Sequence, residues 1–200
     1  MVVTIEVSAG DIQGFGHVRI IIGLVTGLSV TRILNGLARF VQHPGKQAIY
    51  PAHMIWAMFM LLFVTHFWWF QFGLSTIRQW QYPEYVFVIS YAALMFFISS
   101  LLFPDQMGEY SGFEDYFHSR ARWFYGLLAA LFLIDLADTA MKGGAHFRAM
   151  GAMYPLRQSI LAGLAIIGMF LSNRLYHIAF GALAILAQIW WISARFLLLD

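Results

Sequence analysis

Long apolar stretches alternate with short polar ones along the whole chain. Most of the apolar stretches are about 20 residues long, the length of helix that crosses a hydrocarbon core of about 30 Å. The pattern predicts an all-α, polytopic transmembrane bundle, and we expect one domain that covers residues 1–200. It contains about six spans, at residues 18–41, 53–74, 85–103, 123–141, 156–171 and 177–199.

The polar connections between these stretches are short, with one exception. His43-Pro44-Gly45-Lys46 has the composition of a turn. The long connection, residues 105–122, ends in a segment that mixes aromatic and charged residues, and residues 113–123 predict one interfacial amphipathic helix before the fourth span. We expect that helix to lie in the headgroup plane.

The composition supports a membrane protein, since 60% of the residues are hydrophobic and 11% are charged. Soluble domains average about 25% charged residues. Trp and Tyr near the ends of the spans are typical of aromatic belts at headgroup depth; they include Tyr50, Trp80, Tyr82, Tyr85, Tyr116, Trp123, Tyr154 and Tyr176. The chain is therefore expected to be a multi-pass protein of a cell (inner) membrane.

The distribution of charge adds little to the prediction of a multi-pass membrane protein. The net charge of +2 comes from scattered residues, so nucleic-acid binding is excluded, and the absence of cysteine excludes thiolate catalysis. An even number of spans places both termini on one side. Lys and Arg divide almost equally between the sides, and the acidic long connection favours cytoplasmic termini.

Arg32 carries the strongest functional signal, because it falls inside the first predicted span, where an arginine is costly. It belongs to a polar stripe at helical spacing that also contains Asn35. Asp135 and Asp138 are the acidic residues inside the predicted spans, and Asp135 is the expected partner of Arg32 from across the bundle. Such a pair either fixes helix packing or gates a pathway for ions.

Three further groups are candidates for chemistry. His66 lies within the second span, where it could relay protons or simply pack. The long connection supplies an acidic outer vestibule or a solvated loop, formed by Asp105, Glu109, Glu114 and Asp115. Four histidines at span ends are the candidate metal or haem ligands, although none has helical ligand spacing: His43, His53, His118 and His177.

Three functions remain open from the sequence. The first is a small channel or transporter for protons or other cations, with Arg32, Asn35, Asp135, Asp138 and His66 along the path. The second is a structural or accessory subunit of a larger membrane complex. The third is a haem- or metal-dependent membrane enzyme, although the chain has none of the usual nucleotide or hydrolase motifs. No cofactor is expected for the first two, and small residues in the last spans favour a homo-oligomer or a larger complex in the bilayer.

Overall fold

The structure is a computed structural model that describes residues 9–43, 45, 48–76 and 80–195, and these residues form helices and no strands. The elements in chain order are α1 (Ala9–Gln42), α2 (Pro51–Phe70), the 3₁₀ helix η1 (Gln71–Thr76), α3 (Tyr82–Leu102), α4 (Phe113–Met141), α5 (Gly144–Ala149), α6 (Met153–Gly168) and α7 (Arg174–Arg195). The prediction of an all-α bundle is confirmed.

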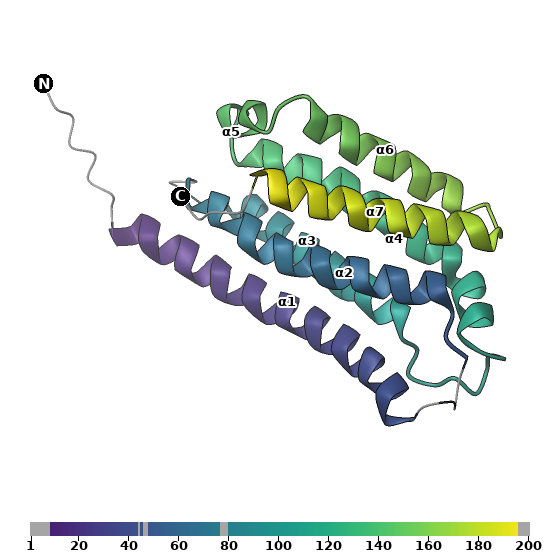
Figure 1. Cartoon of the computed structure of the whole chain (residues 1–200). Helices are drawn as coiled ribbons and strands as arrows, with labels where there is room; N and C mark the ends of the chain where they lie inside the picture. Colours follow the sequence, from purple (N-terminus) through teal and green to yellow (C-terminus); the bar gives the residue numbers. More distant parts are fainter. Residues whose placement is uncertain (1–8, 44, 46–47, 77–79, 196–200) are drawn as a thin grey trace, which may run out of the picture.

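Five stretches of helix are long and apolar enough to cross a membrane: α1, α2 with η1, α3, α4 and α7. The predicted span 156–171 falls on α6, which has 16 residues and so rises about 24 Å at about 1.5 Å per residue. Although short, α6 runs alongside α4 (Figure 1). The end of the last predicted span, residues 196–199, lies outside the described residues.

The start of α1 and the end of α7 lie at the same end of the bundle, together with η1 and α5 (Figure 1). We call this the terminal end. The opposite end carries the connection between α3 and α4 and the turn between α6 and α7, and we call it the loop end. The chain therefore passes back and forth between two ends.

The interfacial helix expected at residues 113–123 is not a separate element, because these residues form the first turns of α4. Gly112 is the N-cap, and neither proline nor glycine interrupts the helix before Gly126. Phe113 and Phe117 are buried, and the Tyr116 hydroxyl donates a hydrogen bond to the carbonyl of Leu101, at 2.6 Å. Phe113, Tyr116 and Phe117 therefore face the bundle rather than lipid headgroups, whereas Trp123 at the end of the segment is exposed.

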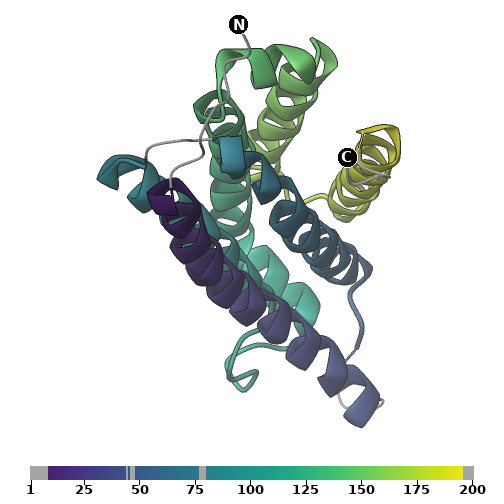
Figure 2. The same ribbon diagram turned by 90° about the vertical axis from the view of Figure 1, so that its left-hand side faces the viewer.

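The longer helices form two layers. In one layer α2 packs between α1 and α7, and in the other α4 packs between α3 and α6. The layers meet where α1 contacts α3 and where α2 contacts both α3 and α4. Figure 2 shows the separation of α1 and α7 on either side of α2.

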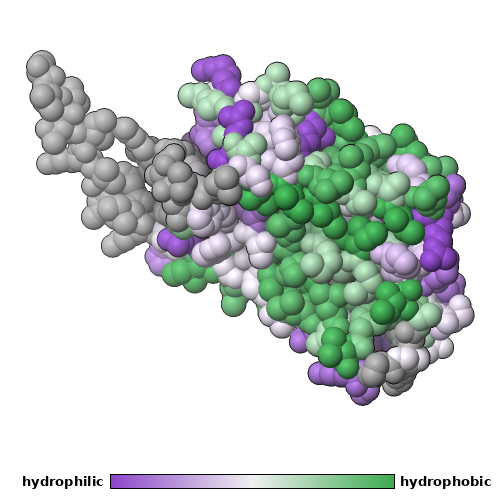
Figure 3. All heavy atoms as spheres, in the orientation of Figure 1, coloured by the Kyte–Doolittle hydropathy of each residue, from purple (hydrophilic) through white to green (hydrophobic). Residues whose placement is uncertain are grey.

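The space between the layers is filled mainly by aromatic rings. Trp56 makes edge contacts with Phe59, Phe124 and Phe180 at centroid distances of 5.0–5.4 Å, which is the favoured range for edge-to-face packing. Large apolar side chains also cover the outside, where Figure 3 shows a broad hydrophobic surface with hydrophilic residues gathered toward the ends. Such a surface is suited to lipid rather than to water.

Candidate functional site

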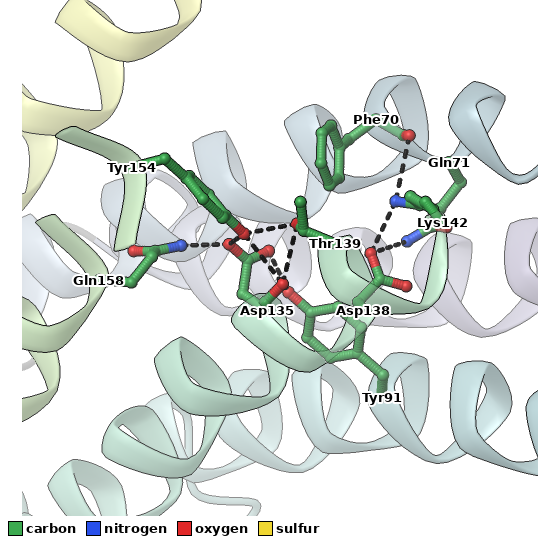
Figure 4. Close-up of polar contacts among 9 residues, drawn as sticks. All are labelled: Phe70, Gln71, Tyr91, Asp135, Asp138, Thr139, Lys142, Tyr154 and Gln158. Atoms are coloured by element: carbon green, nitrogen blue, oxygen red, sulfur yellow. Dashed lines mark hydrogen bonds and ion pairs between the residues drawn. The ribbon is translucent and has the colours of Figure 1, made fainter. Parts of the chain in front are cut away.

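A buried carboxylate on α4, that of Asp135, is the centre of a polar network near the terminal end (Figure 4). The Tyr91 hydroxyl donates to its Oδ1 at 2.7 Å, and the Tyr154 hydroxyl donates to its Oδ2 at 2.7 Å. Gln158 Nε2 also donates to Oδ2, and Thr139 Oγ1 lies 2.6 Å from the Tyr154 hydroxyl. Every hydrogen bond that the described residues donate to this carboxylate comes from a neutral group.

One turn further along α4, the Asp138 carboxylate is paired with a cation. Lys142 Nζ donates to Asp138 Oδ2 at 2.6 Å, and both side chains are fully buried. The same ammonium lies 3.3 Å from the carbonyl oxygen of Phe70 and 3.6 Å from the centre of its ring. Gln71 Nε2 is 3.5 Å from Asp138 Oδ2, whereas Asp138 Oδ1 has no hydrogen-bond partner among the described residues.

The network continues from α4 through α6 and α7 to α2. Gln158 connects Asp135 to Arg157, because Arg157 Nη1 donates to Gln158 Oε1 at 3.4 Å. Arg157 Nη2 donates to Gln188 Oε1, and Gln188 Nε2 lies 3.1 Å from His66 Nδ1. Acidic, basic, amide and hydroxyl groups from five elements are thus connected within the apolar bundle.

Helical spacing explains how the sequence builds this cluster. Asp135, Asp138, Thr139 and Lys142 lie three or four residues apart, so they form one stripe on α4. Tyr154 and Gln158 are four residues apart, on the face of α6 that packs against that stripe. The polar faces of α4 and α6 pack against each other, and in this way their buried polar groups obtain hydrogen-bond partners.

His146 of α5 lies between this network and the terminal surface. Its ring is 5.9 Å from that of Phe70, and a Cβ added at Gly73 would contact both Lys142 and His146. Partial burial lowers the pKa of His146, and the neighbouring Lys142 ammonium lowers it further. Both effects favour the neutral imidazole over the charged one beside the buried pair.

The predicted pairing of Arg32 with Asp135 is wrong. Arg32 Nη2 instead donates to Asp105 Oδ1 at 2.5 Å and to the carbonyl oxygen of Phe103 at 2.9 Å. The helices are longer than the predicted spans, so Arg32 lies about 10 Å past the middle of α1, toward the loop end, and Asp135 lies about 12 Å past the middle of α4, toward the terminal end. Arg32 and Asp135 therefore lie toward opposite ends of the bundle.

The other predicted pathway residues divide in the same way. His66 belongs to the buried network and Asp138 to the buried pair one turn from Asp135, whereas Asn35 is exposed on the outer face of α1. Sequence reasoning missed Tyr91, Gln158 and Gln188, and it assigned Tyr154 to an aromatic belt although Tyr154 is buried. The spacing of Tyr154 and Gln158 was the available signal, but it does not identify the acid that they bind.

The four acidic residues proposed for a vestibule, Asp105, Glu109, Glu114 and Asp115, are exposed at the loop end. Asp115, in the first turn of α4, accepts hydrogen bonds from the backbone and side chain of Ser111, which precedes the helix. Asp105 lines a cavity of about 410 Å³ beside the end of α1, together with Arg39 and His43. A basic residue therefore shares that cavity with the acid.

The candidate metal ligands do not assemble. His43 is exposed, His53 lies with Nε2 2.5 Å from the carbonyl oxygen of Leu102, and the rings of His118 and His177 are 5.3 Å apart. Within the described residues, no group of three or more His, Cys, Asp or Glu side chains could hold a metal ion.

His118 and His177 belong to a second polar chain, at the loop end. Tyr50 OH lies 3.2 Å from His118 Nε2, and Tyr125 OH lies 2.9 Å from His177 Nδ1. Trp56 Nε1 donates to the Tyr125 oxygen at 3.1 Å, so the Tyr125 hydroxyl hydrogen is available to His177. This chain leads from the loop end toward the middle of the bundle.

Comparison with known protein families, curated proteins and solved structures finds nothing that matches this chain.

Proposed function

We propose that this protein moves protons or other cations across a membrane, as a small channel or transporter. The observation that carries the proposal is the Asp135 carboxylate, which is buried and hydrogen-bonded by Tyr91, Tyr154 and Gln158 rather than by a cation. Ionisable groups at membrane depth mark ion pathways by default. A carboxyl group held by neutral donors can take up and release a proton without losing an ion-pair partner.

The neighbouring groups supply a route from the terminal end to Asp135. His146 is partly exposed beside the Lys142–Asp138 pair, and Asp138 is one turn from Asp135 on the same helix. The free Oδ1 of Asp138 can accept a proton or a water molecule. A proton would thus enter past His146, reach Asp138 and pass on to Asp135.

An aromatic layer separates this route from the polar chain at the loop end. Phe132 contacts Phe59 and Phe63 at centroid distances of 6.0 and 6.3 Å. Tyr125 and Asp135 are ten residues apart on α4, or about 15 Å. The packed rings favour a closed state, and transport would require these side chains to move.

The proposal is tested by proton flux in liposomes that contain a pH-sensitive dye, with a membrane potential imposed by a potassium gradient and valinomycin. We expect Asp135→Asn to reduce the flux to that of protein-free liposomes, since an amide cannot carry the proton. Glu84→Gln, which removes an acid from the first turn of α3 outside the network, is the matched control and should retain full flux. Circular dichroism and gel filtration establish that both variants fold.

Two results would contradict the proposal. One is the absence of proton, sodium and potassium flux above the protein-free rate in the unaltered protein. The other is an Asp135→Asn variant that conducts at the unaltered rate for each of these ions.

Membrane placement and assembly are part of the same proposal. We place the protein in a cell membrane with its termini in the cytoplasm. The described Lys and Arg residues give no bias, with Arg19, Lys142, Arg148, Arg157 and Arg195 toward the terminal end and Arg32, Arg39, Arg120, Arg122 and Arg174 toward the loop end. Self-association is supported by the small and polar residues on the outer face of α1, namely Gly27, Thr31 and Asn35.

A further inference from the structure

A separate cavity of about 300 Å³ opens at the loop end, between the early turns of α4 and the turn that joins α6 to α7. Its position is distinct from the Asp135 network, which lies near the terminal end. The residues that line it are His118, Ser119, Ala121, Arg122, Met169, Phe170, Leu171 and Ser172. These described lining residues include no Asp or Glu.

One arginine lines this cavity and a second lies beside it, while Glu114 is close enough to Tyr50 to interact with it electrostatically. Arg122 is exposed, and no hydrogen bond or ion pair to another described residue is found for its guanidinium. Arg174 lies over the ring of Tyr50 at 5.7 Å, and the Tyr50 hydroxyl contacts His118 at 3.2 Å. A second guanidinium is therefore anchored next to the lining residue His118.

Hydroxyl groups complete the polar wall, and apolar side chains surround it. Ser172 is exposed at the cavity, whereas the Ser119 hydroxyl already donates to the carbonyl of Tyr116 at 2.8 Å. Trp123 and Phe170 are 67% and 71% exposed. An exposed tryptophan next to an arginine is typical of the headgroup region of a membrane.

We propose that this cavity binds a phosphate group, either in the headgroup of a phospholipid or as free inorganic phosphate. The planar guanidinium of Arg122 matches phosphate oxygens through paired hydrogen bonds. The Ser172 hydroxyl and Arg174 supply a further donor and a second positive charge. In a lipid complex, the acyl chains would lie along Phe170, which lines the cavity and is exposed.

The chain provides a matched pair of variants for the test. Arg122→Gln and Arg120→Gln each remove one positive charge from the same helix, two residues apart. Arg120 does not line the cavity, and its guanidinium donates to the Tyr110 hydroxyl at 2.8 Å. A difference between the two variants therefore reports the cavity and not the overall charge.

Binding is measured on the full chain in detergent by native mass spectrometry with added dioleoylphosphatidylglycerol, and separately by equilibrium dialysis with inorganic phosphate. We expect Arg122→Gln to weaken binding about tenfold, in keeping with the loss of one charge-assisted contact. Arg120→Gln should bind within about twofold of the unaltered protein. Ser172→Ala, a small change outside the helices, should show a weaker loss than Arg122→Gln.

The two measurements distinguish the source of the phosphate. Lipid binding alone, with dependence on Arg122, supports a headgroup site, and binding of inorganic phosphate with the same dependence supports a site for the free anion. The proposal is overturned if neither probe binds, or if the two arginine variants lose binding equally.

Discussion

An acid and a base are in contact at each end of the bundle, and the two contacts are almost equally short. At the loop end, Arg32 Nη2 and Asp105 Oδ1 are 2.5 Å apart, with side chains 27% and 78% exposed. Near the terminal end, Lys142 Nζ and Asp138 Oδ2 are 2.6 Å apart, with both side chains fully buried. Water can therefore replace either partner at the first contact and neither partner at the second.

Distance alone therefore does not set the importance of an ion pair. An exposed pair contributes little, since water and salt screen the attraction. A buried pair has already lost its hydration, so removal of one partner leaves a charge with no compensation. The same physics ties the protonation of Asp138 to Lys142, whereas Asp135 has neutral donors and no ion-pair partner to lose.

The largest effect is expected for Lys142→Met, which leaves the Asp138 carboxylate buried without its cation. We expect the free energy of unfolding to fall by about 3–5 kcal/mol. Denaturation with sodium dodecyl sulfate in mixed micelles, followed by circular dichroism, measures this loss. The double variant Lys142→Met with Asp138→Leu removes both charges and should recover most of the stability. Loss of less than about 1 kcal/mol in the single variant would show that water reaches the pair.

An intermediate loss in the free energy of unfolding is expected at the loop end, where the cause is packing rather than charge. A Cβ added at Gly36 would overlap the ring of Phe103, the residue whose carbonyl accepts a hydrogen bond from Arg32. Gly36→Ala should therefore cost about 1–3 kcal/mol in the same denaturation assay. Gly27→Ala is the control on the same helix, because nothing lies within 4 Å of its added Cβ. Equal stabilities for the two variants would mean that α1 and α3 are not closely packed at Phe103.

The smallest effect is expected for Asp105→Asn, which removes the charge from the exposed pair. The expected loss is below about 1 kcal/mol, and about 1 M salt should abolish it by screening the unaltered protein. Denaturation at low and high salt checks both statements. A loss comparable to that of Lys142→Met would erase the distinction between the two ends.

The sequence singled out two acids that the structure buries, for a reason that can be traced to particular residues. Asp135 and Asp138 were identified because an acid inside an apolar stretch is unusual whatever its neighbours, and both are buried. Arg32 was selected by the same rule, but its predicted span began nine residues after the true start of α1 and so placed it too near the middle. Asp135 and Arg32 then appeared to face each other.

The sequence could not identify Asp135 as the partner of Tyr91 and Gln158. A tyrosine or glutamine in an apolar helix is compatible with many neighbours, and its partner depends on which helices lie side by side. The prediction of an interfacial helix was wrong for a related reason. Aromatic residues mixed with charged ones suit both a headgroup surface and the first turns of a long buried helix. Tertiary packing decided between them.

Hydropathy, a local property that can be read along the chain, was enough to predict a membrane environment and to find Asp135 and Asp138 inside an apolar stretch. Only the tertiary structure decided which groups meet: Arg32 with Asp105, Asp138 with Lys142, and Asp135 with hydroxyls and an amide from α3 and α6. A partner is selected by the order of helices in two layers and by the true length of each helix, and neither is encoded in the hydropathy of any one stretch.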